Sequence, residues 1–235
     1  EVYSIDEAFL SVGGCKWRDL MEYGKQIRRT VKQWTGIPVS VGMAETKVLA
    51  KIANRIAKRT PDTGGVFDLF ACPDREAVLR RVAVEDIWGI GPNSARLLKQ
   101  HGIMTALQLR QADDRWIRNH LGIVGLRLVY ELRGRSCLEL EECPQPKQGI
   151  TCSRAFGKPI ATPSEMEEAV SSYVARAAQK LRGEGLAATV LTVFLMTNEF
   201  KEEPQYRNSV TCPLAVGTDT TSELIRAALR GLRTI

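Results

Sequence analysis

The N-terminal third of the chain alternates between β-prone segments and amphipathic helices, and this alternation restricts the fold more than any other feature of the sequence. Residues 2–12 combine β-branched, aromatic and aliphatic side chains, and residues 38–43 and 66–69 are short apolar runs, so all three segments predict strands. Residues 17–35 and 46–59 repeat apolar side chains at steps of three and four, which predicts helices packed on a sheet. A hairpin turn in the first segment would give the order strand, strand, helix, strand, helix, strand and an α+β fold.

Composition permits a multidomain globular protein and is weak evidence about its partner. A chain of 235 residues with 44% hydrophobic residues can hold two or three small domains. It has no run of about twenty apolar residues and no secretory signal, and it begins with Glu inside a motif, so we expect a fragment of a longer cytoplasmic protein. The net charge of +6 favours an anionic partner, although no segment is a basic tail. Six cysteines without a C-x-x-C pair, and only two histidines, argue against a zinc site and for reduced thiols.

Two adjacent carboxylates, Asp6 and Glu7, lie in the middle of the first β-prone segment. On a regular strand they would point to opposite faces and could not share a ligand. If residues 4–7 form a tight hairpin turn, both side chains can converge at one end of a sheet. Paired carboxylates of that kind suit Mg²⁺, which also binds substrate phosphates. The alternative is one buried and one solvated acid with no shared role.

The predicted helix 46–59 carries a basic line at steps of three and four, formed by Lys47, Lys51, Arg55 and Lys58. These cations either form an ordinary solvated face or face a triphosphate or a DNA backbone. The sequence alone leaves both interpretations open.

Residues 72–138 have only helical patterns, and inside them lies a helix-hairpin-helix signature. Gly89 and Gly91 permit a sharp turn with exposed N–H groups, and the following helix offers its positive N-terminal end to a phosphate. Arg96 and Lys99 could add charge-assisted contacts to that phosphate. The alternative is a plain helical turn with two glycines. Two acids at 113 and 114 precede an apolar run and are expected to cap a helix rather than to act in catalysis.

A Pro-containing linker at residues 139–148 separates this helical block from a second mixed segment. The segment is predicted to have a βαββα order. Its elements are a strand at 150–160, a helix at 163–183, strands at 187–197 and 206–212, and a helix at 219–233.

Taken together these motifs resemble the Y-family translesion DNA polymerases, most closely the bacterial UmuC-type branch, the catalytic part of the error-prone DNA polymerase V. The segments that carry the resemblance are Y-S-I-D-E-A-F-L at residues 3–10, the G-M-A-E-T-K…L-A-K-I-A-N…A-K helix, the G-I-G hairpin and T-C-S-R-A-F-G at 151–157. The resemblance implies an incomplete ferredoxin-like palm at 1–71, an all-helical thumb at 72–138, the linker at 139–148 and an incomplete little finger at 149–235.

The resemblance also implies roles for single residues. Asp6 and Glu7 would bind the catalytic metals, with two Mg²⁺ ions in the whole protein, and Lys58 would contact the triphosphate of the incoming nucleotide. Ser153, Arg154 and Lys158 would contact the DNA backbone, unless they are ordinary edge-strand charges. The usual first strand of the palm has no counterpart in this sequence. In the family, that missing part carries the first metal-binding Asp, the residue that excludes ribonucleotides, and the fingers. We therefore expect these 235 residues alone to lack polymerase activity.

Primer-template DNA and a deoxynucleoside triphosphate are the partners that the resemblance implies, in SOS-type damage tolerance in a bacterial, nucleoid-associated setting. An accessory dimer, a recombinase filament and a sliding clamp are further partners in the family, but no residue of this chain displays them. The alternative function is a relative that binds DNA backbones without chemistry, against which the intact Asp6–Glu7 pair argues. A nucleotidyl cyclase on a similar palm ranks last, because it would need no helix-hairpin-helix.

Overall fold

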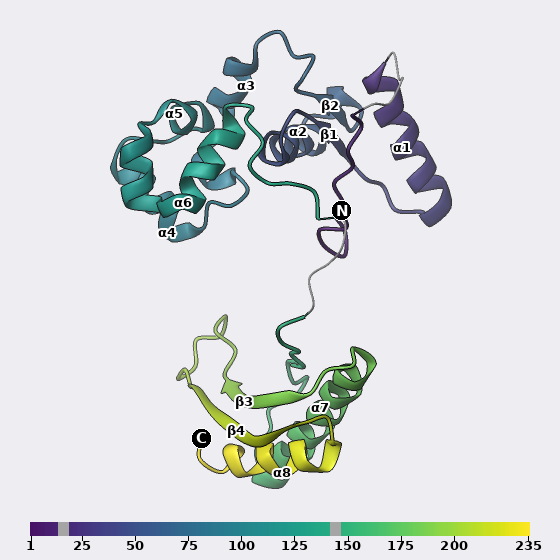
Figure 1. The fold of residues 1–235 in the computed structure, drawn as a ribbon, viewed down its shortest axis with the longest axis vertical. Helices are drawn as coiled ribbons and strands as arrows, with labels where there is room; N and C mark the ends of the chain where they lie inside the picture. The colour runs from purple at the N-terminus through teal and green to yellow at the C-terminus, as the bar shows by residue number, and fades with distance from the viewer. Residues whose placement is uncertain (14–18, 142–146) are drawn as a thin grey trace. The chain divides into compact units, whose positions relative to one another are not determined.

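The computed structural model describes residues 1–13, 19–141 and 147–235 of the chain. It divides into two compact units, Glu1–Pro144 and Gln145–Ile235 (Figure 1), so the division falls inside the predicted linker. The predicted helix start at residues 17 and 18 and the middle of the predicted linker lie outside the described residues. The boundary between palm and thumb at 71/72 stays a prediction. None of the described helices is both long and apolar enough to span a membrane.

A small parallel sheet and two helices form one part of the first unit (Figure 1). Its elements are α1 (Leu20–Thr35), β1 (Val41–Met43), α2 (Lys47–Arg59), the short 3₁₀ helix η1 (Pro61–Thr63) and β2 (Val66–Asp68). Strands β1 and β2 pair in parallel, and Gly42 faces Phe67 in their register. A Cβ atom on Gly42 would lie 2.0 Å from the backbone nitrogen of Asn54, so α2 lies directly on β1. The predicted helix–strand–helix–strand order of residues 19–69 is confirmed.

The first β-prone segment is a hairpin turn and not a full strand. Its only described strand-like pairing is the antiparallel bridge between Val2 and Ala8, and neither residue belongs to the β1–β2 sheet. The prediction of two sheet strands in this segment was therefore wrong for the described residues. Backbone hydrogen bonds close the hairpin, because the N–H groups of Tyr3 and Ser4 both donate to the carbonyl of Glu7.

The helical block completes the first unit and shares one apolar core with α2. Its elements are α3 (Arg75–Arg81), the 3₁₀ helix η2 (Val84–Asp86), α4 (Pro92–Gln100), α5 (Ala106–Gln111) and α6 (Asp114–Leu132). Helix α5 begins with a capping box in which Thr105 and Gln108 bond each other's backbone, and Asp113 caps α6. Helix α6 is kinked at Gly122, whose φ of 69° only glycine adopts readily. The predicted helical block, with its capping acid at 113, is confirmed.

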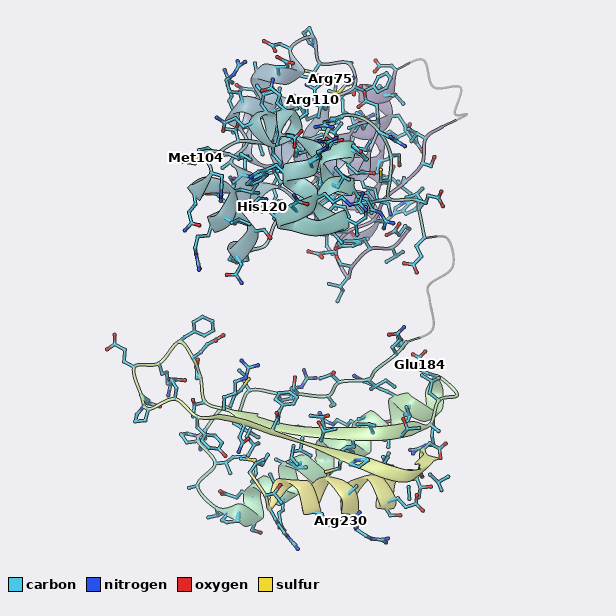
Figure 2. All side chains as sticks on the ribbon, turned by 60° about the vertical axis from the view of Figure 1, so that its left-hand side comes forward. Arg75, Met104, Arg110, His120, Glu184 and Arg230 are labelled. Carbon is cyan, nitrogen blue, oxygen red and sulfur yellow. The ribbon has the colours of Figure 1, made fainter. Side chains whose placement is uncertain are left out.

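The second unit is an antiparallel pair of strands with two helices (Figure 1). Its elements are α7 (Pro163–Gly183), β3 (Ala188–Met196), β4 (Arg207–Thr218) and α8 (Thr221–Leu232). Leu191, Val193 and Val210 pack on the helices from the inner face of the sheet. Figure 2 shows Arg230 on α8, away from the sheet, and Glu184 at the end of α7, where its carboxylate pairs with Lys147.

Residues 150–160 form no strand, so the first β element of the predicted βαββα order was wrong. Strands β3 and β4 pair with each other, and the structure gives residues 150–160 no backbone ladder to either of them. The segment is fixed by side chains instead: Ile150 packs on a core cluster, and the Phe156 ring stacks on Tyr173 of α7 with centroids 6.2 Å apart. β-Propensity alone does not make a strand, because a strand also needs a second segment to pair with.

Candidate functional site

The two adjacent acids lie on a closed hairpin turn. The N–H groups of Tyr3 and Ser4 donate to the carbonyl oxygen of Glu7 at 2.9 and 3.1 Å. The Ser4 hydroxyl donates to the Asp6 carboxylate at 2.7 Å, which fixes that exposed side chain from inside the turn. The alternation of a strand is thus broken at the acids, as the turn hypothesis requires.

The hairpin docks on α2 through lysines of the predicted basic line. Lys51 Nζ lies 2.5 Å from Glu7 Oε1 and 5.9 Å from the centroid of the Tyr3 ring. Lys47 pairs with Glu1, and its Nζ lies 5.2 Å from the centroid of the Phe9 ring. The Lys47 ammonium holds the pKa of the Glu1 carboxyl below its ordinary value of 4.5. These two lysines therefore do not belong to a solvated face.

Lys58 differs from the rest of the basic line. Arg55 and Arg59 both pair with Asp86, which precedes the helix-hairpin-helix loop. Lys58 is exposed near the C-terminal end of α2, and the described residues give it no ion pair. It is the cation of this line that an external anion can bind without displacing an internal partner.

Asp6 and Glu7 would be two oxygen ligands of an incomplete set if they held Mg²⁺. Among the described residues there is no group of three or more His, Cys, Asp or Glu side chains that could hold a metal ion. Two carboxylates suit Mg²⁺ when water and substrate phosphates complete its octahedron. Glu7 would have to share its carboxylate with Lys51 or leave that ion pair. The four cysteines in the described ranges are free and form no cluster with these acids.

The helix-hairpin-helix loop depends on two glycines in different ways. Gly89 has a φ of +93°, and a Cβ atom there would lie 2.9 Å from Leu128 Cδ1. Gly91 is the N-cap of α4 with a φ of −79°, and a Cβ atom there would meet no atom within 4 Å. No side chain caps α4, and Pro92 at its first position has no N–H, so the N–H groups of Asn93 and Ser94 are those that a ligand could bind. Gly89 makes the turn possible, whereas Gly91 leaves space for a ligand to reach the N-terminus of α4.

The two cations predicted beside this loop are not equivalent. Lys99 Nζ lies 2.6 Å from Glu85 Oε1, and this ammonium holds the pKa of the Glu85 carboxyl below its ordinary value of 4.5. Arg96 is exposed and takes part in no ion pair in the described part of the chain. A phosphate at the loop would thus find Arg96 free and would compete with Glu85 for Lys99.

In the second unit, Ser153, Arg154 and Lys158 are all exposed on the irregular segment before α7. Arg154 and Phe156 line a shallow groove together with Tyr173 and Arg176 of α7. The structure brings an aromatic pair and two guanidinium groups to this groove. It does not align the three predicted residues on one strand.

Sequence reasoning missed two features that connect the site to the helical block. One is a cluster of three aromatic rings, in which Trp88 Nε1 donates to Tyr3 Oη at 3.1 Å and Phe9 completes the group. The other is Glu131 on α6, whose side chain is fully buried and bonds the N-terminal turn of α2. The single acidic residue within the apolar pattern of 126–132 was a usable signal for Glu131. The contact between Trp88 and Tyr3 had no sequence signal.

Comparisons with known proteins give a consistent picture. The family model described as impB/mucB/samB family matches residues 1–55, and the model of that family's C-terminal domain matches residues 147–235. The chain is 44% identical to Protein UmuC of Salmonella typhimurium over 235 residues, covering 99% of this chain and 56% of that protein. It is 40% identical to Protein MucB of Escherichia coli over 230 residues, covering 97% and 55%. The chain thus spans little more than half the length of these relatives.

More distant matches agree with these. DNA polymerase IV 2 of Mycobacterium tuberculosis is 26% identical over 207 residues, which are 88% of this chain and 58% of that protein. A solved Y-family DNA polymerase chimera of Dbh and Dpo4 superimposes with a TM-score of 0.64 at 20% identity, covering 92% of this chain and 58% of that one. This structural likeness shows a shared fold.

Proposed function

The chain belongs to the UmuC-type branch of the Y-family DNA polymerases, and from this premise we propose that it supplies two metal-binding carboxylates and the DNA-binding surfaces of an error-prone translesion polymerase. The reaction would be attack of a primer 3′-hydroxyl on the α-phosphate of a deoxynucleoside triphosphate, with loss of pyrophosphate. The observation that carries the proposal is the closed turn bearing Asp6 and Glu7, docked through Lys51 on a helix whose Lys58 is free to bind an anion.

The proposal assigns a role to four residues of this turn and helix. Asp6 and Glu7 would hold Mg²⁺, and the bound ion would lower the pKa of the primer hydroxyl and stabilise charge on the leaving oxygens. Lys51 holds the Glu7 carboxylate in a fixed direction, and Glu7 would share this carboxylate between Lys51 and the metal ion. Lys58 would neutralise part of the triphosphate charge.

The DNA would be held by its backbone. The open N-terminus of α4, beside Gly91, can accept one phosphate through N–H groups, and Arg96 can add a charge-assisted bond. Ser153, Arg154 and Lys158 would extend the same kind of contact from the second unit. Such contacts carry no sequence information, so binding should be independent of sequence and sensitive to salt.

A second function, DNA-backbone binding without chemistry, is favoured by one observation. Glu7 is already neutralised by Lys51, and the described residues offer no third ligand beside the acids. Replacing Asp6 and Glu7 by Ala in the full-length protein separates the two. A polymerase should lose primer extension and keep its DNA affinity, whereas unchanged extension would remove the acids from the mechanism.

Gly91 offers a direct test of the DNA-binding surface with the 235-residue chain. Gly91→Leu should leave the fold unchanged, because its φ is ordinary and the space is open, but it should block the approach of a phosphate. We expect the dissociation constant for duplex DNA, measured by fluorescence anisotropy at fixed salt, to rise roughly tenfold, which corresponds to about 1.4 kcal/mol. Gln33→Leu on the exposed face of α1 is the matched control. Equal affinities of the two variants would exclude this loop as the phosphate site.

A further inference from the structure

Trp88 joins the helix-hairpin-helix loop to the carboxylate turn by direct contact. It immediately precedes Gly89 in the chain, and its indole N–H donates to the Tyr3 hydroxyl at 3.1 Å. The two rings meet edge to face, with centroids 5.3 Å apart and planes at 83°. Phe9 lies 5.8 Å from each of them and closes the cluster. The contact connects residues 85 positions apart in the chain.

On the loop side, the position of the indole is fixed by its neighbours in the sequence. Ile87 is only 2% exposed and anchors the chain in the core, while Gly89 lies close against Leu128. Asp86 is held by Arg55 of α2. Trp88 is thus held between a buried residue and a tight turn, so a displacement of the loop would move its ring.

On the turn side, Tyr3 belongs to the same small ring of hydrogen bonds as the acids. Its N–H donates to the carbonyl of Glu7 at 2.9 Å, and Lys51 contacts both the Glu7 carboxylate and the Tyr3 ring. A displacement of the Tyr3 ring would therefore change the position of Glu7. Tyr3 is 45% exposed, so burial alone does not hold it, and the hydrogen bond to Trp88 supplies direction.

We propose that Trp88 is a positioning residue that couples docking of a DNA backbone at residues 89–91 to the placement of the Asp6–Glu7 turn. This inference rests on the proposed function, because it assigns DNA to the loop and a divalent cation to the turn. By thermodynamic linkage the coupling is reciprocal: a cation at the turn raises DNA affinity by the same factor by which DNA raises cation affinity. A purely structural role of the aromatic cluster would stabilise the fold without linking the two ligands.

The hydrogen bond itself is tested by a spectroscopic signature. The sequence holds four tryptophans, so ¹⁵N-labelled indoles give a small set of N–H signals, and Trp88→Phe identifies the signal of Trp88. Tyr3→Phe keeps the ring and removes only the accepting oxygen. It should shift the Trp88 signal and speed its exchange with solvent while the other indole signals stay in place. If Tyr3→Phe moves no indole signal, the link between loop and turn is absent and the proposal is overturned.

The coupling is tested by measuring duplex DNA affinity with and without Mn²⁺ at constant ionic strength. We expect Mn²⁺ to raise the affinity about fivefold in the wild type. Trp34→Phe is the matched control, because Trp34 is 81% exposed on α1, and it should retain the full effect. In Tyr3→Phe and Trp88→Phe the effect should fall below about twofold, with the affinity in the absence of Mn²⁺ unchanged.

Two controls separate a failure of this inference from a failure of the proposed function. In the double variant Asp6→Ala, Glu7→Ala, any change of DNA affinity on adding Mn²⁺ comes from Mn²⁺ bound to the DNA, and this change is the baseline. Electron paramagnetic resonance counts the Mn²⁺ ions bound to the protein without DNA. Loss of bound Mn²⁺ in the double variant supports the acids as ligands, and equal Mn²⁺ binding by wild type and double variant overturns the proposed metal site. If the wild type binds Mn²⁺ at these acids but its DNA affinity responds no more than the baseline, the coupling is refuted. A full Mn²⁺ effect in both ring variants also refutes it.

Discussion

Glu131 should be the side chain of the first unit whose removal costs most stability outside the apolar core. It is 0% exposed on α6, and its carboxylate accepts three backbone N–H groups, from Val48 at 3.2 Å, Cys137 at 2.6 Å and Leu138 at 3.0 Å. Its own carbonyl oxygen accepts the hydroxyl of Thr46, the N-cap of α2, at 2.9 Å. Glu131 therefore ties the positive N-terminal end of α2, which carries the site lysines, to the helical block.

The cost of Glu131→Ala follows from the donors that it leaves without a partner. A buried N–H group that loses its acceptor costs about 1–3 kcal/mol, so the three give at most about 3–9 kcal/mol, because the groups of Cys137 and Leu138 are only partly buried. Water that enters the vacated space recovers part of this, and we expect a loss of about 3–5 kcal/mol, a large part of a typical free energy of unfolding of about 5–15 kcal/mol. Glu131→Gln keeps one acceptor oxygen and turns a donor toward the remaining N–H, so it should cost about 1–3 kcal/mol.

The assay is urea unfolding followed by tryptophan fluorescence. All four tryptophans precede residue 117, so the signal reports on the unit Glu1–Pro144 alone. Glu76→Ala is the matched control, because its side chain is 56% exposed and its contact with Arg110 is 3.4 Å long, and it should change stability by less than about 0.5 kcal/mol. A loss below about 1 kcal/mol for Glu131→Ala, with an unchanged denaturant slope, would refute the reasoning.

Three further perturbations have outcomes that the structure fixes. Gly42→Ala should destabilise the first unit by about 3 kcal/mol or more in the same urea assay, because its Cβ would lie 2.0 Å from the backbone nitrogen of Asn54; a loss under about 1 kcal/mol would contradict the close packing of α2 on β1. Gly89→Ala should cost about 1–3 kcal/mol from its φ of +93°, and wild-type stability would contradict the strained turn. The guanidinium of Arg133 holds the pKa of the Asp114 carboxyl below its ordinary value of 3.8. The unfolded chain thus binds the proton more readily, so this contribution is complete above about pH 4 and is lost as the pH falls. Asp114→Asn should make the urea midpoint less dependent on pH in that range, and an unaltered dependence would exclude this ion pair as a cause.

Much of the fold could be predicted because its signals are local. The helix at 163–183 has the predicted bounds, because Thr162 and Glu165 form a capping box at its start and an apolar face runs along its length. The glycine turn before α4 and the cap at Thr105 could also be predicted, since each depends on a few neighbouring residues. The prediction of a strand at 150–160 was wrong, because a strand forms only when a second segment supplies its hydrogen bonds, and this pairing cannot be read from the segment itself.

The sequence by itself identified the candidate functional residues: two acids on a predicted turn, a basic helix and a glycine loop before a helix N-terminus. Tertiary structure decided which of these residues are free. It paired Lys51 with Glu7 across 44 positions and Lys99 with Glu85, and it left Lys58 and Arg96 exposed without an ion pair among the described residues. It also brought Trp88 to Tyr3 across 85 positions. Periodicity and capping act within a few residues and are therefore written in the sequence, whereas ion pairs and ring contacts depend on the distances that packing sets between remote segments.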